Sequence, residues 1–393
     1  MSDWKQCTLA DLGEIVGGAT PSTKNESYYG GDISWITPKD LSNFQGRYIS
    51  KGERNITSEG LKNSSARIMP PNSVLFTSRA PIGYVAISEN EVCTNQGFKS
   101  IVPNTETDYL FLYYLLLYNR DRIESMGSGT TFKEISGSIM KRIEVVVPKD
   151  KVEQQMIAKT LGAIDDKIAI NTKINHNLEQ QAQAIWIERF GCYEPNGVLG
   201  DYATVKSGYA FKSSWWQDSG VKVIKIKNIT NTGLNLNDCS FVSEEKVNLA
   251  KEFVAQVGDL LIAMTGATIG KFAIVPQSEE TLLVNQRVGK FFFKDVPVLE
   301  RLPFLWCVLK QDSVFNEIIN RGQGSAQPNI SPTDIMTIPV FIPSDSEVTD
   351  FNETLQSSFE IITTNYAENE KLALLRDTLL PRLMSGELSV ADI

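Results

Sequence analysis

The chain of 393 residues has an ordinary globular composition, 42% hydrophobic and 22% charged, which excludes a disordered chain, a fibre and a small disulfide scaffold. Its 38 Lys and Arg stand against 47 Asp and Glu, and the resulting charge of −9 by itself argues against a nucleic-acid binder. The chain has no apolar run of membrane-spanning length, no signal-peptide pattern and no CxxC pair among its five cysteines, so we expect a cytoplasmic protein with reduced thiols and no metal site.

In chain order, residues 1–148 consist of short β-branched and aromatic runs broken by Gly, Pro, Asn and Ser, which predicts a β-rich domain with a few helices. Residues 149–190 nearly lack Gly and Pro and predict one long helix. A second β-rich segment follows over 191–343, and a second helical segment over 344–393. We expect Pro381 to stop or kink the second helix, so that the two helices differ at their ends.

The second half of the chain repeats the first at an offset of about 190 residues. The block SRAPIGYVAI at 78–87 returns as TGATIGKFAI at 265–274, and GSGTTFKEIS at 127–136 returns as GQGSAQPNIS at 322–331. The Asn-Gln pair at 95–96 returns at 285–286. Because the blocks keep their order, the sequence predicts two copies of one unit.

Both helical segments carry a heptad seam in which spacings of four and three alternate. The first seam runs through Ile157, Leu161, Ile164, Ile168, Asn171, Asn175, Leu178, Ala182 and Ile185. The second runs through Phe351, Leu355, Ser358, Ile362, Asn365, Asn369, Leu372, Arg376 and Leu379. Antiparallel pairing would bring Asn171 near Asn369 and Asn175 near Asn365, where buried amides fix register; alternatively, these residues face solvent where the seam drifts.

The acidity is confined to one part of the chain. Residues 1–148 and 191–343 each carry a net charge of −1, whereas the 3 basic and 10 acidic residues of 344–393 give a net charge of −7. A nearly neutral domain can still bind a phosphate backbone if its basic groups lie on one face. The overall charge therefore does not exclude DNA as a partner.

Catalytic motifs are absent, so we predict no catalytic residue and no metal ligand. His176 is the only histidine, and it lies on the flank of the first long helix, away from any expected Ser/His/Asp arrangement. TGATIGKF lacks the spacing and the Ser or Thr of a P-loop, and no adenine-methyltransferase signature occurs. Asp165-Asp166-Lys167 is similar to a nuclease motif only in composition.

Taken together, the repeated blocks resemble the DNA-specificity (S) subunits of type I restriction–modification enzymes. The resemblance covers nearly the whole chain and rests on LGEIVGGATPSTK, WITPKDLS, PNSVLFTSRAPIGYVAI, TNQGFKSI, VVVPKDKVEQQMIAKTLGAIDDKI, VKSGYAFKS, VGDLLIAMTGATIGKFAI, VNQRV and LLPRLMSGEL. It implies an α+β fold with target-recognition domains at 1–148 and 191–343. It also implies that the spacer helices at 149–190 and 344–393 pair as an antiparallel coiled coil with pseudo-twofold symmetry.

The resemblance further implies a non-catalytic subunit that directs DNA methylation and defence against foreign DNA. Each recognition domain would read one half of a bipartite, asymmetric double-stranded DNA site, while the helices set the gap and dock two methyltransferase subunits. S-adenosylmethionine would bind to those subunits, and ATP and Mg²⁺ to two motor-nuclease subunits where the system has them. The alternatives are a specificity subunit of a methylation-only or type II-like system, a fused enzyme acting in cis, and a repeat scaffold that binds protein or glycan.

The DNA-contacting candidates are Lys and Arg, which bind phosphates or guanine, and loop Asn, Ser, Thr and aromatic residues. In the first domain they are Thr20, Ser22, Thr23, Lys24, Asn25, Lys39, Ser42, Asn43, Gln45, Arg47, Arg79 and Lys99. In the second they are Tyr209, Phe211, Lys212, Lys225, Lys227, Asn228, Thr230, Asn231, Thr265, Lys271 and Arg287. Many of the loop residues are alternatively plain turn formers, and Asn95 and Asn285 are expected to satisfy backbone groups rather than contact DNA.

Overall fold

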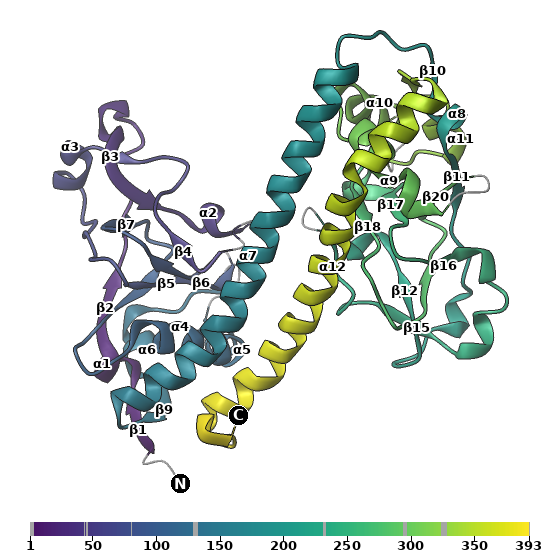
Figure 1. Cartoon of the computed structure of the whole chain (residues 1–393). Coiled ribbons are helices and arrows are strands. Elements are labelled where there is room, and N and C mark those ends of the chain that lie inside the picture. The colour runs from purple at the N-terminus through teal and green to yellow at the C-terminus, as the bar shows by residue number, and fades with distance from the viewer. Residues whose placement is uncertain are drawn as a thin grey trace. The chain divides into compact units, whose positions relative to one another are not determined.

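The computed structural model describes residues 4–42, 44, 46–79, 81–128, 133–230, 233–293, 297–323 and 328–392. The chain divides into two compact units (Figure 1). Unit 1 comprises Met1–Asp166 and Ala373–Ile393, and unit 2 comprises Lys167–Leu372. Each unit therefore contains one β-rich segment together with a part of both long helices.

Unit 1 is organised around a five-stranded sheet whose order is β2 (Gly13–Gly17), β8 (Lys99–Pro103), β5 (Val74–Ser78), β6 (Ile82–Ser88) and β4 (Tyr48–Ile49). The pair β4/β6 is parallel, and the pairs β2/β8, β5/β8 and β5/β6 are antiparallel. Two further pairs are the parallel β3 (Tyr29–Ile36) with β7 (Val92–Thr94) and the antiparallel β1 (Trp4–Thr8) with β9 (Glu144–Pro148). The short helices are η1 (Glu26–Tyr28), α1 (Leu9–Leu12), α2 (Pro38–Ser42), α3 (Ser58–Lys62), α4 (Tyr109–Tyr118), α5 (Arg120–Ser125), α6 (Gly137–Arg142) and η7 (Val390–Asp392).

Unit 2 contains an antiparallel sheet in the order β11 (Thr204–Ser207), β20 (Val288–Phe292), β17 (Leu260–Ala263) and β18 (Phe272–Ile274). A second sheet has the order β15 (Ser240–Val242), β12 (Val221–Ile224), β19 (Leu282–Val284) and β16 (Val254–Ala255), with β12 and β19 parallel. Two antiparallel pairs are β10 (Gly197–Val198) with β21 (Pro339–Val340) and β13 (Ile229–Thr230) with β14 (Gly233–Leu234). The short helices are α8 (Leu199–Tyr202), α9 (Val298–Leu309), α10 (Asp312–Gly322), α11 (Pro332–Met336), η2 (Ser213–Trp215), η3 (Ile226–Asn228), η4 (Glu244–Lys246), η5 (Lys251–Phe253) and η6 (Gly266–Thr268).

The two units share one strand arrangement, which confirms the internal repeat. The order β2-β8-β5-β6 in unit 1 corresponds to β11-β20-β17-β18 in unit 2. The parallel pair β3/β7 corresponds to β12/β19, and the antiparallel pair β1/β9 to β10/β21. The predicted fold class, with mixed helices and strands and two long helices, is therefore confirmed.

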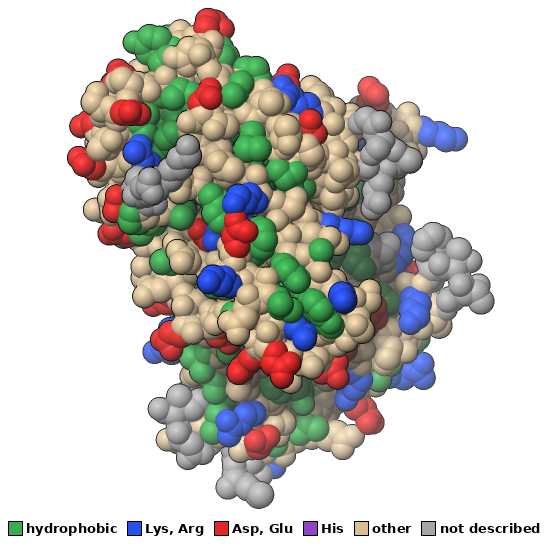
Figure 2. All heavy atoms as spheres, turned by 90° about the vertical axis from the view of Figure 1, so that its right-hand side faces the viewer, with side chains coloured by type: hydrophobic (Ala, Val, Ile, Leu, Met, Phe, Trp, Pro, Cys, Tyr) green, Lys and Arg blue, Asp and Glu red, His purple; other side chains and the backbone are tan. Residues whose placement is uncertain are grey.

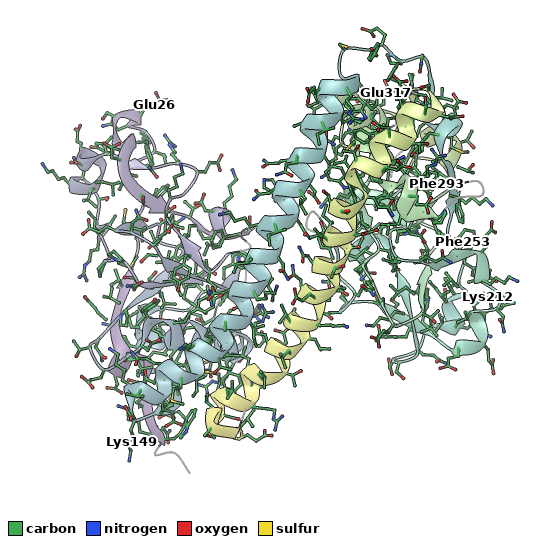
Figure 3. The ribbon with its side chains drawn as sticks, in the orientation of Figure 1. Glu26, Lys149, Lys212, Phe253, Phe293 and Glu317 are labelled. Atoms are coloured by element: carbon green, nitrogen blue, oxygen red, sulfur yellow. The ribbon has the colours of Figure 1, made fainter. Side chains whose placement is uncertain are left out.

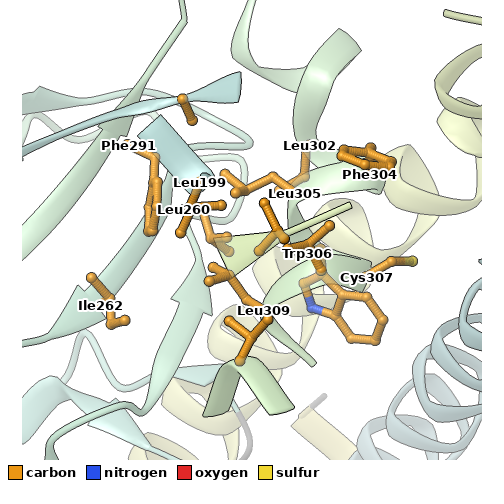
Figure 4. Packing of buried hydrophobic residues seen from close by; sticks show 14 of the residues in the cluster. Leu199, Leu260, Ile262, Phe291, Leu302, Phe304, Leu305, Trp306, Cys307 and Leu309 are labelled. Carbon is orange, nitrogen blue, oxygen red and sulfur yellow. The ribbon is translucent and has the colours of Figure 1, made fainter. Parts of the chain in front are cut away.

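A short, largely apolar helix lies in the core of each unit, as expected for a helix surrounded by other elements. In unit 1 the Asp108 carboxylate caps α4 by accepting from the backbone N–H of Leu110 and Phe111. In unit 2, α9 packs against the β11-β20-β17-β18 sheet (Figure 4), and its Leu302, Phe304 and Leu305 are fully buried. Each such side chain stabilises the fold by roughly 1.5–3 kcal/mol.

The long helices α7 (Lys151–Phe190) and α12 (Asp345–Met384) each have 40 residues. They begin and end at equivalent positions of the repeat, so the expectation that their ends differ is wrong. Pro381 does not end α12, which continues to Met384, and the Pro381 carbonyl accepts a hydrogen bond from the Ser385 N–H at 3.0 Å. Among the described residues, no helix is long and apolar enough to cross a membrane.

The mid-seam asparagines of unit 2 form two amide pairs between α7 and α12. Asn171 Nδ2 donates to Asn369 Oδ1 at 2.9 Å, and Asn365 Nδ2 donates to Asn175 Oδ1 at 2.7 Å. These contacts confirm the expected antiparallel pairing. Asn171 and Asn365 occupy equivalent positions of the repeat, so in both pairs the first Asn of one helix donates to the second Asn of the other.

Candidate nucleic-acid interface

Three segments far apart in sequence meet at the end of β5 in unit 1, and their equivalents meet at the end of β17 in unit 2. In unit 1 the Ser78 N–H donates to the Gly97 carbonyl at 2.7 Å, and the Ile135 N–H donates to the Ser78 carbonyl at 2.9 Å. We call this meeting point cradle 1, formed by residues 78–79, 95–97 and 134–135.

The same two backbone hydrogen bonds are present in unit 2. The Met264 N–H donates to the Arg287 carbonyl at 3.1 Å, and the Ile330 N–H donates to the Met264 carbonyl at 2.9 Å. We call this place cradle 2, formed by residues 264–265, 285–287 and 329–330. The two cradles therefore share one backbone framework.

The asparagine of each Asn-Gln pair closes a tight turn within its cradle. Asn95 Oδ1 accepts from the Gly97 N–H at 2.9 Å, and Asn285 Oδ1 accepts from the Arg287 N–H at 3.3 Å. This geometry confirms that the two asparagines satisfy backbone groups, as Asn in a turn commonly does. The adjacent Gln96 and Gln286 side chains are exposed.

Cradle 1 gathers two cations around one carboxylate. Glu134 lies 3.6 Å from Arg79 and 3.7 Å from Lys99. Lys99 Nζ also donates to Ser78 Oγ at 3.5 Å and to the Phe98 carbonyl at 3.3 Å, so this side chain is held in place. Partly exposed pairs of this kind stabilise by about 0–1 kcal/mol, which leaves the Arg79 guanidinium able to exchange partners.

Cradle 2 borders an open cleft of about 440 Å³. Its lining comprises Ser207, Met264, Thr265, Gln286, Arg287, Pro328, Asn329, Ile330, Ser331 and Pro332. Arg287 is exposed and, within the described part of the chain, has no carboxylate partner. The Thr265 hydroxyl is buried, and no described residue hydrogen-bonds to it.

The loop that follows β2 in unit 1 is attached to cradle 1. The Thr20 hydroxyl hydrogen-bonds Gln96 Oε1, and the Trp35 indole N–H donates to the Ala19 carbonyl at 3.0 Å. Asn25 caps η1 by accepting from the Ser27 N–H at 3.2 Å. The remaining candidates of this loop, which are Ser22, Thr23 and Lys24, are exposed.

Two candidates after the WITP block, Lys39 and Ser42, make contacts within unit 1. Lys39 pairs with Glu53 at 2.6 Å, and both side chains are largely exposed. The Ser42 hydroxyl donates to the Lys39 carbonyl at 2.7 Å. Asn43 and Gln45 lie outside the described residues.

Arg47 holds elements of unit 1 together instead of facing solvent. Its side chain is 10% exposed, and it donates to Tyr114 Oη at 3.0 Å and to the Gly162 carbonyl at 3.1 Å. It also forms an ion pair with Asp166. This placement corrects the expectation of a DNA contact, because the guanidinium donors are occupied by α4 and α7.

Aromatic and lysine side chains gather beside β12 in unit 2. We call this group the aromatic patch; its members are Tyr209, Phe211, Lys212, Trp215, Trp216, Lys225 and Lys246. Tyr209 and Trp215 are stacked with ring centroids 6.3 Å apart, and the Lys212 ammonium lies 5.5 Å from the Trp215 ring. Figure 3 shows Lys212 on the outer side of the unit.

The side chains of the aromatic patch differ in how exposed they are to a bound partner. The Lys225 ammonium lies 3.5 Å from the Trp216 ring centre, and burial lowers the pKa of Lys225. Phe211 is buried in a core cluster with Val223 of β12 and Leu283 of β19, which corrects its assignment as a DNA contact. Lys212 is exposed and Tyr209 is half-buried.

Asn228 is also a structural residue. It is fully buried, accepts from the Lys225 N–H at 2.9 Å and donates to the Asn235 and Asp238 carbonyls at 2.9 Å, which corrects its assignment as a DNA contact. Lys227 pairs with Asp238 at 2.8 Å. The Thr230 hydroxyl donates to the Gly233 carbonyl at 2.8 Å, and Asn231 lies outside the described residues.

Lys271 lies on a second cleft of unit 2, of about 590 Å³, beside η6 and α10. Lys310 and Phe315 also line this cleft, and the Lys310 ammonium lies 5.2 Å from the Phe272 ring centre. Thr265 lines the first cleft and Thr230 the second, and Pro328 lines both.

Glu134 and Asn329 lie in the cradles but were not among the residues predicted from the sequence, and Gln96 and Gln286 were noted there only as members of the repeated Asn-Gln pairs. Glu134 and Asn329 occupy equivalent places, since the former forms an isolated bridge with Arg79 and the latter with Thr265. The blocks GSGTTFKEIS and GQGSAQPNIS contain both residues, so the aligned repeat was the signal that could have found them.

The charged side chains of unit 2 are not gathered in one basic patch on the face seen in Figure 2. Lys and Arg side chains alternate there with acidic and apolar ones. Within the described ranges, no group of three or more His, Cys, Asp and Glu side chains is placed to hold a metal ion. His176 is exposed on the flank of α7.

Comparison with known proteins places these features in a family context. The sequence profile of the type I restriction modification DNA specificity domain matches residues 1–180 and 196–373. The chain is 33% identical to the MjaIX specificity subunit of Methanocaldococcus jannaschii, over 100% of this chain and 95% of the relative. It is 28% identical to the EcoR124I/EcoR124II specificity subunit of Escherichia coli, over 42% of this chain and 41% of the relative.

A solved structure supports the fold. The crystal structure of the S subunit of a type I restriction–modification system from M. genitalium superposes with a TM-score of 0.60 at 19% identity, covering 98% of this chain and 96% of that one.

Proposed function

Because the chain belongs to the type I restriction–modification DNA specificity family, we propose that cradle 1 and cradle 2 each read one half of a bipartite DNA site. Its relatives are specificity subunits, and the two matched domains fit two target-recognition domains. The observation that carries the proposal is that the two cradles share a backbone framework and differ in side chains, with Arg79, Gly97 and Glu134 in one and Thr265, Arg287 and Asn329 in the other. A common scaffold with different polar groups suits two readers of different sequences.

The accessible polar groups of the cradles suit base recognition. Arg and Lys pair with guanine, and Asn and Gln pair with adenine through two hydrogen bonds. Arg79 and Gln96 supply these groups in unit 1, and Gln286, Arg287 and Asn329 supply them in unit 2. The exposed Ser22, Thr23, Lys24, Lys39 and Ser42, together with Lys212, Lys227 and Lys271, are candidates for phosphate contacts, which position a protein without reading sequence.

The remaining activities of such a system belong to other chains in this proposal. Two methyltransferase subunits bind S-adenosylmethionine and dock on the long helices, and motor-nuclease subunits, where present, use ATP and Mg²⁺. The paired helices set the gap between the half-sites, and the Asn171–Asn369 and Asn175–Asn365 pairs fix their register.

The test is selection of binding sites from random double-stranded DNA by the chain assembled with its methyltransferase subunit. We expect two short specified sequences separated by an unread gap. Exchanging residues 1–148 for the equivalent domain of a relative should change one half only. A change in both halves, or DNA affinity that does not fall with rising salt, would contradict the proposal, because phosphate contacts release counterions.

A further inference from the structure

Arg287 occupies the position at which the two cradles differ most. Its backbone is fixed on both sides, because its N–H donates to Asn285 Oδ1 at 3.3 Å and its carbonyl accepts from the Met264 N–H at 3.1 Å. Gly97 has the same two backbone contacts in cradle 1. The side chain at this position is therefore the variable part of a constant turn.

Unit 1 has no room for a side chain at this position. A Cβ built on Gly97 would lie 2.8 Å from Pro38 Cγ and 2.9 Å from Asn95 Oδ1, closer than Cβ contacts in proteins. In unit 2 the equivalent position carries the long side chain of Arg287, which ends in a guanidinium group. A contact made by Arg287 thus has no counterpart in unit 1.

The surroundings of Arg287 favour a base edge over a phosphate. Among the described residues lining the cleft, Arg287 carries the only charge, and the other polar side chains are the hydroxyls and amides of Ser207, Thr265, Gln286, Asn329 and Ser331. Amides and hydroxyls both donate and accept, as base edges require, whereas a phosphate site gathers several donors and cations. The Thr265 hydroxyl, to which no described residue hydrogen-bonds, is a further group that a ligand in the cleft would satisfy.

We propose that Arg287 is the specificity-determining residue for a G·C pair in the half-site read by unit 2, its guanidinium donating to guanine O6 and N7 in the major groove. Arginine suits this role because its planar fork makes two parallel hydrogen bonds, and it stays charged at every relevant pH. The cleft walls formed by Thr265 and Asn329 border the same base pair. This inference rests on the proposed function and names one of its contacts.

The experiment compares site selection by the wild type, Arg287→Ala and Arg287→Lys, each assembled with the methyltransferase subunit. Lys251→Ala is the matched control, since it removes one exposed positive charge from the same unit. We expect the wild type to specify guanine at one position of one half-site. Arg287→Ala should lose that preference and bind the wild-type site about 5- to 150-fold more weakly, leaving the other half-site unchanged.

Arg287→Lys should keep the salt dependence but lose most of the guanine preference, because an ammonium lacks the fork. Lys251→Ala should keep the selected sequence. Uniformly weaker binding to all sequences by Arg287→Ala, with a salt slope smaller by about one, would mean a phosphate contact and overturn the inference. If Arg287→Ala selected the same DNA sequence as the wild type, the inference would also be overturned. Absence of any sequence preference in the wild type would instead contradict the proposed function itself.

Discussion

Arg376 of α12 and Asp165 of α7 form an ion pair with Nη1 and Oδ1 2.8 Å apart, and unit 2 replaces this pair with Ala182 and Phe359. Both replacements are fully buried. An aromatic side chain of a short helix contacts this position in each unit: Tyr114 of α4 donates its hydroxyl to Asp165 Oδ2 at 2.5 Å, whereas Trp306 of α9 packs edge-on against Phe359 with ring centroids 5.6 Å apart. The end of α12 in unit 1 therefore has a polar contact, and the equivalent contact in unit 2 is apolar.

Replacing Asp165 with Ala is expected to destabilise unit 1 by about 2 kcal/mol, between the values for exposed and buried ion pairs, because Arg376 keeps some exposure. The double variant Asp165→Phe with Arg376→Ala installs the unit 2 pair in unit 1. It should recover part of the loss, which a double-mutant cycle by urea denaturation measures. Strictly additive losses would show that the two positions are not coupled.

Removing both asparagines of one amide pair should raise the stability of unit 2 but loosen the register between α7 and α12. Asn171→Leu with Asn369→Leu is expected to raise the denaturation midpoint, because the buried Asn171 amide and the half-buried Asn369 amide are replaced by apolar groups, while the selected gap between half-sites becomes heterogeneous. Asn171→Leu alone should be less stable than the double variant, because Asn369 then loses its donor. A double variant that retains a single gap length would contradict the register role. The matched control is Lys173→Leu on the exposed side of α7.

Lys290 and Asp259 form a buried pair 2.5 Å apart in the β11-β20-β17-β18 sheet region. Lys290→Met is expected to destabilise unit 2 by about 3 kcal/mol, because it leaves the Asp259 carboxyl buried without its cation. Adding Asp259→Asn removes that charge and should restore much of the stability, as followed by thermal unfolding. Equal stability of the single and double variants would contradict this account.

Burial raises the pKa of the Glu179 carboxyl, and Lys310, the Tyr366 hydroxyl and His176 only partly oppose it. A raised pKa in the folded state means that protonation favours folding, so this contribution is complete below the ordinary glutamate pKa and is lost as the pH rises through the folded value. Glu179→Gln keeps an acceptor for the Tyr366 hydroxyl, which lies 3.1 Å away. We expect this variant to be more stable than the wild type at pH 7 and to show a flatter stability profile from pH 4.5 upward. A variant that is less stable at pH 7 would contradict the assigned cause.

Local pattern was enough to predict the repeat, both long helices and the Asn171–Asn369 and Asn175–Asn365 pairs. The reason is that a heptad seam and an ordered set of strand blocks are periodic properties of the chain itself. At Pro381 the local pattern predicted a helix end, but α12 continues to Met384. Leu383 and Met384, which follow the proline, pack in the unit 1 core.

Only the tertiary structure decided what each polar loop residue does. In the sequence, Arg47 and Asn228 are indistinguishable from exposed residues that contact DNA. In the structure, Arg47 donates to groups on α4 and α7, and Asn228 donates to the loop carbonyls of Asn235 and Asp238. The cradles likewise join segments separated by tens of residues, so their membership depends on strand order. A side chain's partners are set by which remote backbone lies opposite it, and no local periodicity contains that information.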